Sequence, residues 1–160
     1  MKEIEVSRVL PAPLEQAFEA CGDFTTVAEK ISAIKSLEVI GGGPVQEGTR
    51  FRETRTMFGR DSTEEMEIRD WAPPKGYTVI CDSHGTHYRT LYTFEPVDEN
   101  KTKVTMRFGA EPRTLMAKLM SFFMGKKMFD MVGKCIGDDL EDIGRWLEAN
   151  RSGAAATEGA

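Results

Sequence analysis

Residues 127–149, KMFDMVGKCIGDDLEDIGRWLEA, decide the fold of this chain. At about 100° per residue, apolar side chains form one stripe along this segment and charged side chains occupy the opposite side. The stripe consists of Phe129, Val132, Ile136, Leu140, Ile143 and Leu147. A long helix with a single apolar stripe needs another layer to cover it. We therefore predict a C-terminal helix that packs against a sheet built from the preceding residues.

Those preceding residues alternate between apolar and polar side chains, as in an antiparallel sheet with one buried face. Their connections are short and rich in turn-forming residues, which predicts a meander. We predict two short helices, after Pro13 and after Asp23, and strands at residues 3–10, 36–40, 50–57, 63–71, 77–82, 87–95 and 103–111. The predicted fold is α+β: a helix-grip arrangement in which a curved antiparallel sheet of about seven strands, in the order β-α-α-β6-α, wraps around the long C-terminal helix.

The segment ahead of the long helix carries a second apolar stripe. If residues 115–149 formed one straight helix, Leu115, Leu119 and Phe123 would lie roughly 130° from the main stripe. Gly125 lies between the two stripes, and glycine disfavours a helix by ~1 kcal/mol relative to alanine. We therefore predict a kink or break at residues 124–127. Residues 115–124 are then either a flap over a cavity mouth or one side of a rigid bend.

Composition is that of a globular chain and excludes several functions. The 160 residues, 40% hydrophobic and 29% charged, predict one domain at residues 1–150 and a disordered tail at residues 151–160. A net charge of -5 argues against nucleic-acid binding. No apolar run reaches the ~18 residues of a membrane span, and the start of the chain is unlike a signal peptide, so we expect a cytoplasmic protein. The three cysteines are widely spaced small hydrophobes, and we expect no cofactor.

Several short motifs, in their order and spacing, resemble the START-like (SRPBCC) superfamily, in its polyketide cyclase/dehydrase and lipid-transport branch. They stand at residues 11–18 (PAPLEQAF), 22–24 (GDF), 48–51 (GTRF), 139–141 (DLE) and 146–148 (WLE). The resemblance covers nearly the whole chain. It implies a cavity between the sheet and the C-terminal helix that holds a lipid, a polyketide or another hydrophobic molecule. It leaves catalysis open, because the superfamily includes carriers, sensors and cyclases.

Two charged residues are predicted to point inward. Glu53 and Arg55 share a strand face with Phe51 and Met57, so the alternation that buries the apolar pair also turns the charges toward the core. One interpretation is a polar anchor for a ligand carboxylate or carbonyl in an apolar cavity. The alternatives are an ion pair at the open end of the sheet and a β-bulge that reverses the register.

Hydroxyl groups occupy a second inward face. Tyr88, Thr90 and Tyr92 share a face with Phe94, where their hydroxyls either bond a ligand or reach solvent and backbone. Glycines at 133, 137 and 144 along the main helix either leave space for ligand or let the helix press closely on the sheet. The predicted ligand-binding residues are Phe51, Glu53, Arg55, Met66, Ile68, Tyr88, Thr90, Tyr92, Met106, Phe108, Phe129, Val132, Gly133 and Ile136.

Two further patterns have both a functional and a structural interpretation. His84 and His87 lie across a predicted turn beside Asp82, which suits either a metal ion or, more often, a solvated turn, so we expect no metal site. Lysines at 118, 126 and 127 flank residues 115–123, which suits contact with an anionic membrane or, more often, a solvated face.

Three functions remain on the sequence alone. The first is a protein that binds a small hydrophobic ligand between sheet and helix. The second is a cyclase- or dehydratase-like enzyme in which Glu53, ionised beside Arg55, or a tyrosine transfers a proton. The third is a protein-binding or stress-related module. The ligand, the oligomeric state and the catalytic residues are not specified by the sequence.

Overall fold

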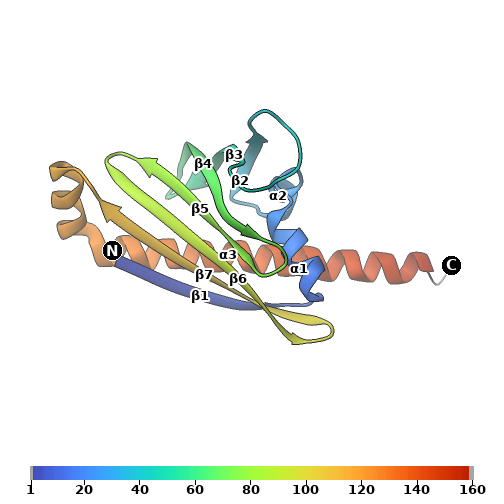
Figure 1. Ribbon diagram of the computed structural model, residues 1–160. Helices are drawn as coiled ribbons and strands as arrows, with labels where there is room; N and C mark the ends of the chain where they lie inside the picture. The colour runs from blue at the N-terminus through green and yellow to red at the C-terminus, as the bar shows by residue number, and fades with distance from the viewer. Residues whose placement is uncertain (1, 159–160) are drawn as a thin grey trace.

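The computed structural model describes residues 2–158 and has the predicted α+β helix-grip fold. A seven-stranded antiparallel sheet curves around a long C-terminal helix (Figure 1). The strands are β1 (Lys2–Leu10), β2 (Ile34–Val39), β3 (Arg50–Met57), β4 (Arg60–Ala72), β5 (Gly76–Ser83), β6 (Thr86–Asp98) and β7 (Lys101–Pro112). The helices are α1 (Leu14–Gly22), α2 (Val27–Lys30) and α3 (Leu115–Glu158).

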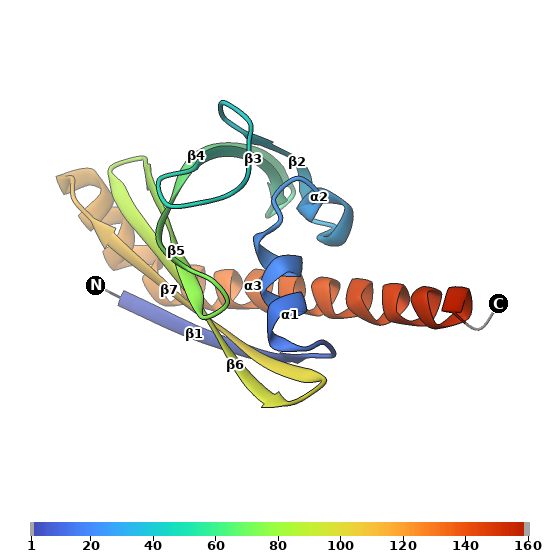
Figure 2. The same ribbon diagram turned by 45° about the vertical axis from the view of Figure 1, so that its right-hand side comes forward.

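Strands β2 to β7 form a meander, and β1 pairs with β7 at the end of it. Its order is β1-β7-β6-β5-β4-β3-β2, so β1 and β2 form the two edges although they are consecutive in sequence. The connection between them contains α1 and α2, which lie on the concave side with α3 (Figure 2). All three helices therefore lie on the concave side of the sheet.

Two hairpin turns are tighter than the sequence predicted. The β3–β4 turn is Phe58-Gly59, with φ of 56° and 75°, and the β5–β6 turn is His84-Gly85, with φ of 48° and 76°. Positive φ at both central residues matches the twist of the flanking strands. The flanking strands consequently run further than expected, and β4 begins at Arg60 instead of residue 63.

Aromatic rings of the core gather where α1 meets the sheet. The ring of Phe18 lies 5.1 Å from that of Trp71, 5.7 Å from that of Tyr77 and 5.0 Å from that of Phe94, centroid to centroid. The side chains predicted to face inward are confirmed as buried or half-buried. Buried among them are Phe51, Ile68, Phe94, Val104, Met106, Ile136, Leu140 and Ile143, and half-buried are Met57, Met66, Tyr92, Phe108 and Val132.

Helix α3 is longer and more continuous than predicted. It is unbroken from Leu115 to Glu158, so the break, one of the two predicted alternatives, is wrong. The predicted change of direction is confirmed, because the first turns of α3 point away from the axis of the rest (Figure 1). A single glycine destabilises a helix by only ~1 kcal/mol relative to alanine, which is too little to interrupt the backbone hydrogen bonds of a long helix.

The C-terminal end of α3 also differs from the expectation. Residues 151–158 are helical where the sequence predicted a disordered tail, and residues 159–160 lie outside the described residues. Despite the length of α3, no helix within residues 2–158 has an apolar stretch long enough to cross a membrane.

Glycines allow α3 to approach β1 closely. A Cβ built on Gly133 would lie 2.6 Å from Cδ1 of Ile4, and one on Gly137 would lie 2.7 Å from Nη2 of Arg8. A Cβ on Gly144 would meet Cδ2 of Leu10 at an ordinary 3.7 Å. A methyl group at Gly133 or Gly137 would therefore have to displace the end of the Ile4 or Arg8 side chain.

This packing predicts opposite effects for two matched substitutions. Gly144→Ala should raise the free energy of unfolding by about 1 kcal/mol, because alanine favours the helix and its methyl group fits. Gly133→Ala gains the same helix propensity but must displace Ile4, so it should be less stable than Gly144→Ala by about 1 kcal/mol or more. Urea denaturation of both variants measures the difference. Equal stabilisation would mean that α3 does not press on β1 at Gly133.

Candidate functional site

A cluster of three charged side chains joins strand β3 to helix α3. Arg55 Nε lies 2.9 Å from Glu53 Oε1, and Arg55 Nη1 lies 2.8 Å from Asp139 Oδ2. The side chains of Glu53 and Asp139 are 11% exposed and that of Arg55 is 16% exposed. Both charges predicted to point inward therefore do so, and they form an ion pair with each other. Arg55 also binds a second carboxylate from the facing helix.

Burial sets the electrostatics of this cluster. Burial would lower the pKa of Arg55, but the carboxylates of Asp139 and Glu53 outweigh it and hold the guanidinium charged. Burial raises the pKa of Asp139 to about 6, against the lowering effect of Arg55. Asp139 thus changes its protonation near neutral pH, which is unusual for an aspartate.

Asp139 is the site residue that sequence reasoning missed. It lies three positions after Ile136 and four before Ile143, so at helical spacing it borders the apolar stripe that covers the sheet. A carboxylate at such a position must be paired, and the inward Arg55 was the available partner. The position of Asp139 beside the apolar stripe and the inward direction of Arg55 could together have predicted this pair.

An aromatic wall continues from the cluster across β5 and β6. Tyr92 stands opposite Tyr77 in the sheet, and the two rings stack at a centroid distance of 4.5 Å. The Tyr77 hydroxyl donates to the carbonyl of Cys21 at 3.2 Å. Burial raises the pKa of Tyr92, with Asp139 and Glu53 adding to the effect, so its hydroxyl stays protonated. Tyr92 therefore offers a hydrogen-bond donor beside the charged cluster.

The concave face is filled at one end and only half-covered at the other. Near α1, the inward residues Phe51, Ile68 and Met106 of the predicted ligand-binding set are buried, as is Ile136 of α3. Toward the β5–β6 turn, residues of the same face keep some exposed surface although they point toward α3. The half-buried members of the set in this region are Glu53, Arg55, Tyr88, Thr90, Phe108, Phe129 and Val132. Met66 and Tyr92 are also half-buried but stand in the middle of the sheet, opposite the buried Phe51 and Met106.

Aromatic side chains bridge sheet and helix at this half-covered end. The ring of Phe108 lies 5.8 Å from that of Tyr88 and 5.9 Å from that of Phe129 on α3. Gly133 is buried but sits against Ile4 at the edge strand β1, apart from this wall. The structure thus brings most of the predicted ligand-binding residues onto one surface and leaves Gly133 beside it.

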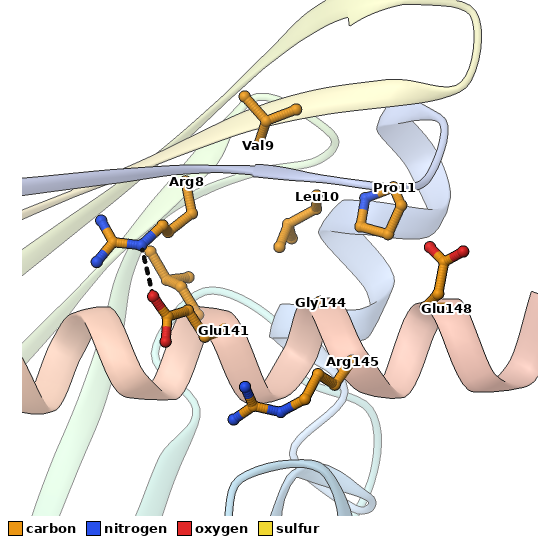
Figure 3. A pocket seen from close by; sticks show the side chains of 9 residues that line it. Arg8, Val9, Leu10, Pro11, Glu141, Gly144, Arg145 and Glu148 are labelled. Carbon is orange, nitrogen blue, oxygen red and sulfur yellow. Dashed lines mark hydrogen bonds and ion pairs between the residues drawn. The ribbon is translucent and has the colours of Figure 1, made fainter.

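Two hollows on the surface contain none of those residues. A groove of about 430 Å³ lies between β1 and α3, where Arg8 pairs with Glu141 at 3.3 Å (Figure 3). A wider one of about 1150 Å³ lies among α1, the β6–β7 turn and α3, and many of its lining residues are charged. Both lack the aromatic wall of the concave face.

The histidines and cysteines take separate positions. His87 bonds Asp82 at 2.8 Å, whereas His84 bonds Ser83 at 2.8 Å. Among the described residues, no three His, Cys, Asp or Glu side chains converge as a metal site would require. Cys21 is buried, whereas Cys81 and Cys135 are half-buried, and all three are free thiols.

Comparison with known proteins identifies the family. A family described as polyketide cyclase / dehydrase and lipid transport matches residues 1–143. The chain belongs to this family. No curated protein sequence matches the chain.

Solved structures share the family fold at low sequence identity. A protein from Thermus thermophilus has a TM-score of 0.77 and 18% identity, over 93% of this chain and 99% of that one. The Zhui aromatase/cyclase from a Streptomyces species has a TM-score of 0.73 and 15% identity, over 92% and 93%. A START superfamily protein from Mycobacterium smegmatis has a TM-score of 0.64 and 11% identity, over 88% and 98%. At these identities the likeness concerns the fold.

The raised pKa of Asp139 predicts a pH-dependent stability. The pKa of about 6 in the folded protein exceeds the ordinary 3.8, so protonation of Asp139 stabilises the fold below pH 3.8, and this stabilisation is lost as pH rises through 6. Asp139→Asn removes this dependence on pH. The variant should match the wild type near pH 4 and gain on it, by on the order of 3 kcal/mol at most, by pH 7. Urea denaturation across this range measures the difference, and a difference that stays constant with pH would contradict the shifted pKa.

Proposed function

We propose that this protein binds a small hydrophobic molecule between the concave face of the sheet and α3, at the half-covered end of the grip. The observation that carries the proposal is the change along this face from buried residues near α1 to half-buried ones near Arg55. Inward apolar and aromatic side chains that keep exposed surface leave room for a ligand. Apolar pockets with a few polar groups are typical ligand sites. Membership of the family supports the same class of ligand.

The charged cluster also indicates the charge of the ligand. Arg55 uses Nε and Nη1 to hold two carboxylates, and a guanidinium has five N–H groups, so donors remain. With both carboxylates ionised, the cluster carries a net negative charge, which disfavours an anionic ligand. We therefore infer a neutral ligand, with a carbonyl or hydroxyl oxygen that accepts a hydrogen bond from Arg55 or Tyr92.

A second candidate function is a cyclase- or dehydratase-like reaction. The specific observation in its favour is the pKa of Asp139, about 6, because an acid that titrates near neutral pH both donates and accepts protons readily. Tyr92 would supply a hydrogen bond to a developing oxyanion. Asp139→Asn separates the two functions. A carrier variant keeps its affinity for a neutral ligand, whereas an enzyme variant loses turnover together with the pH dependence near 6.

A cavity-filling substitution tests the location of the ligand. Thr90→Phe places a ring in the middle of the half-covered wall, so binding of the neutral fluorescent probe N-phenylnaphthylamine should weaken about tenfold or more. Thr93→Phe is the matched control, because Thr93 lies on the opposite face of β6 by strand alternation and should leave binding unchanged. Fluorescence titration measures both affinities. Equal binding by wild type and Thr90→Phe would place the probe outside the grip.

A further inference from the structure

The first turns of α3 expose an unusual amount of apolar surface. Leu115 is 85% exposed, Phe122 is 82% exposed and Phe123 is 74% exposed. Six more large apolar side chains of α3 are exposed with them: Met116, Leu119, Met120, Met124, Met128 and Met131. Contiguous apolar surface of this kind on a folded protein marks an interaction site.

The exposed side chains form one broad face of a helix. At about 100° per residue, the exposed apolar positions between Leu115 and Met124 span an arc of roughly 200°. Ala117 is buried and Ser121 is half-buried, and both fall on the remaining arc, which faces the protein. These turns stand at one end of the sheet and point away from the axis of the rest of α3 (Figure 1). The apolar face is therefore directed away from the core.

Positive charge surrounds this face. No acidic residue occurs between Glu111 and Asp130, whereas Lys118, Lys126 and Lys127 are exposed there. A fourth ammonium, Lys2 Nζ, lies beside Gly125 on the same helix, 2.6 Å from the position a Cβ would take. The whole chain has a net charge of -5, so this local excess of lysine opposes the overall balance.

We propose that residues 115–131 of α3 dock onto the surface of an anionic lipid bilayer. An amphipathic helix with an apolar face and lysines beside it binds in the plane of such a surface. The aromatic and methionine side chains would enter the acyl boundary, while the long lysine side chains reach back to the headgroups. Each lysine near an anionic surface adds attraction that salt screens.

A second copy of the same chain fits this surface less well. A symmetric dimer through residues 115–131 would bring together two copies of Lys2, Lys118, Lys126 and Lys127, against one acidic residue, Asp130, in each copy of the segment. Like charges across an interface oppose association. The charge pattern is therefore complementary to anionic lipid and repulsive toward itself.

Membrane docking goes beyond the ligand site and is independent of it. The docking face points outward, whereas Phe129 and Val132 of the same helix belong to the half-covered wall. A variant that no longer docks on membranes should still bind the ligand, and a variant that no longer binds the ligand should still dock. Failure of either proposal can therefore be recognised separately.

Flotation with vesicles tests the docking surface in the full-length chain. We expect the protein to float with vesicles of equal parts phosphatidylcholine and phosphatidylserine, and to float much less with phosphatidylcholine alone or at high salt. The double variant Phe122→Ser/Phe123→Ser should bind about tenfold more weakly or worse, and Lys126→Gln/Lys127→Gln should lose about tenfold on the anionic vesicles.

Matched controls keep the result interpretable. Val97→Ser removes an exposed apolar side chain on β6, at the other end of the sheet from residues 115–131, and should bind vesicles like the wild type. Sedimentation of each variant in the absence of lipid reports self-association. Failure of the wild type to float with anionic vesicles would overturn the proposal. A dimer that dissociates when the two phenylalanines are replaced would assign the face to a second copy instead. Unchanged binding of the N-phenylnaphthylamine probe by both double variants would confirm that the ligand site is intact.

Discussion

The pairing of Arg55 with Asp139 is the interaction on which the grip depends. Strand β3 lies near the β2 edge of the sheet, whereas α3 packs mainly along β1 at the opposite edge, so this contact spans the concave side. This contact sets where the two layers meet more than it adds stability, because burial costs the Asp139 carboxylate more than Arg55 returns, as its raised pKa indicates. Near the same end, Asp142 of α3 accepts hydrogen bonds from the backbone and hydroxyl of Ser32. The helix is thereby held from both edges of the sheet.

The charged bridge and the aromatic wall explain each other. Apolar side chains in place of this cluster would leave no polar group to orient a ligand. Polar side chains alone would favour water on the concave face. Arg55 and Asp139 join the two layers through a contact of 2.8 Å, and Tyr92 stacks on Tyr77 in the aromatic wall. The neutral ligand proposed above, with one oxygen at its end, would match this gradient from polar to apolar.

Sequence reasoning succeeded where one physical rule dominates. Alternation and helical periodicity located every strand and the long helix, because burial of one face governs both. It was less complete where two rules compete. The phase slip at Gly125 predicted a kink or a break, and α3 is continuous with a bend. The Phe58 turn was predicted too long, because positive φ at a bulky residue has no compositional signal. Asp139 was missed because its position on the helix alone does not mark it as a site residue. Its role becomes visible only through its contact with Arg55.

The order of strands has a consequence for how the chain folds. Lys2 pairs with Ala110, so the first strand to leave the ribosome finds its neighbour only after nearly the whole sheet has been synthesised. Strands β2 to β7 assemble by local hairpins, whereas β1 waits as an unpaired segment, and α3 packs largely on β1. Closure of such a distant pairing is slow because chain entropy must be lost before contacts form. During this interval the open edge of β7 and the uncovered apolar stripe of α3 are the surfaces that a nascent chain would need chaperones to protect.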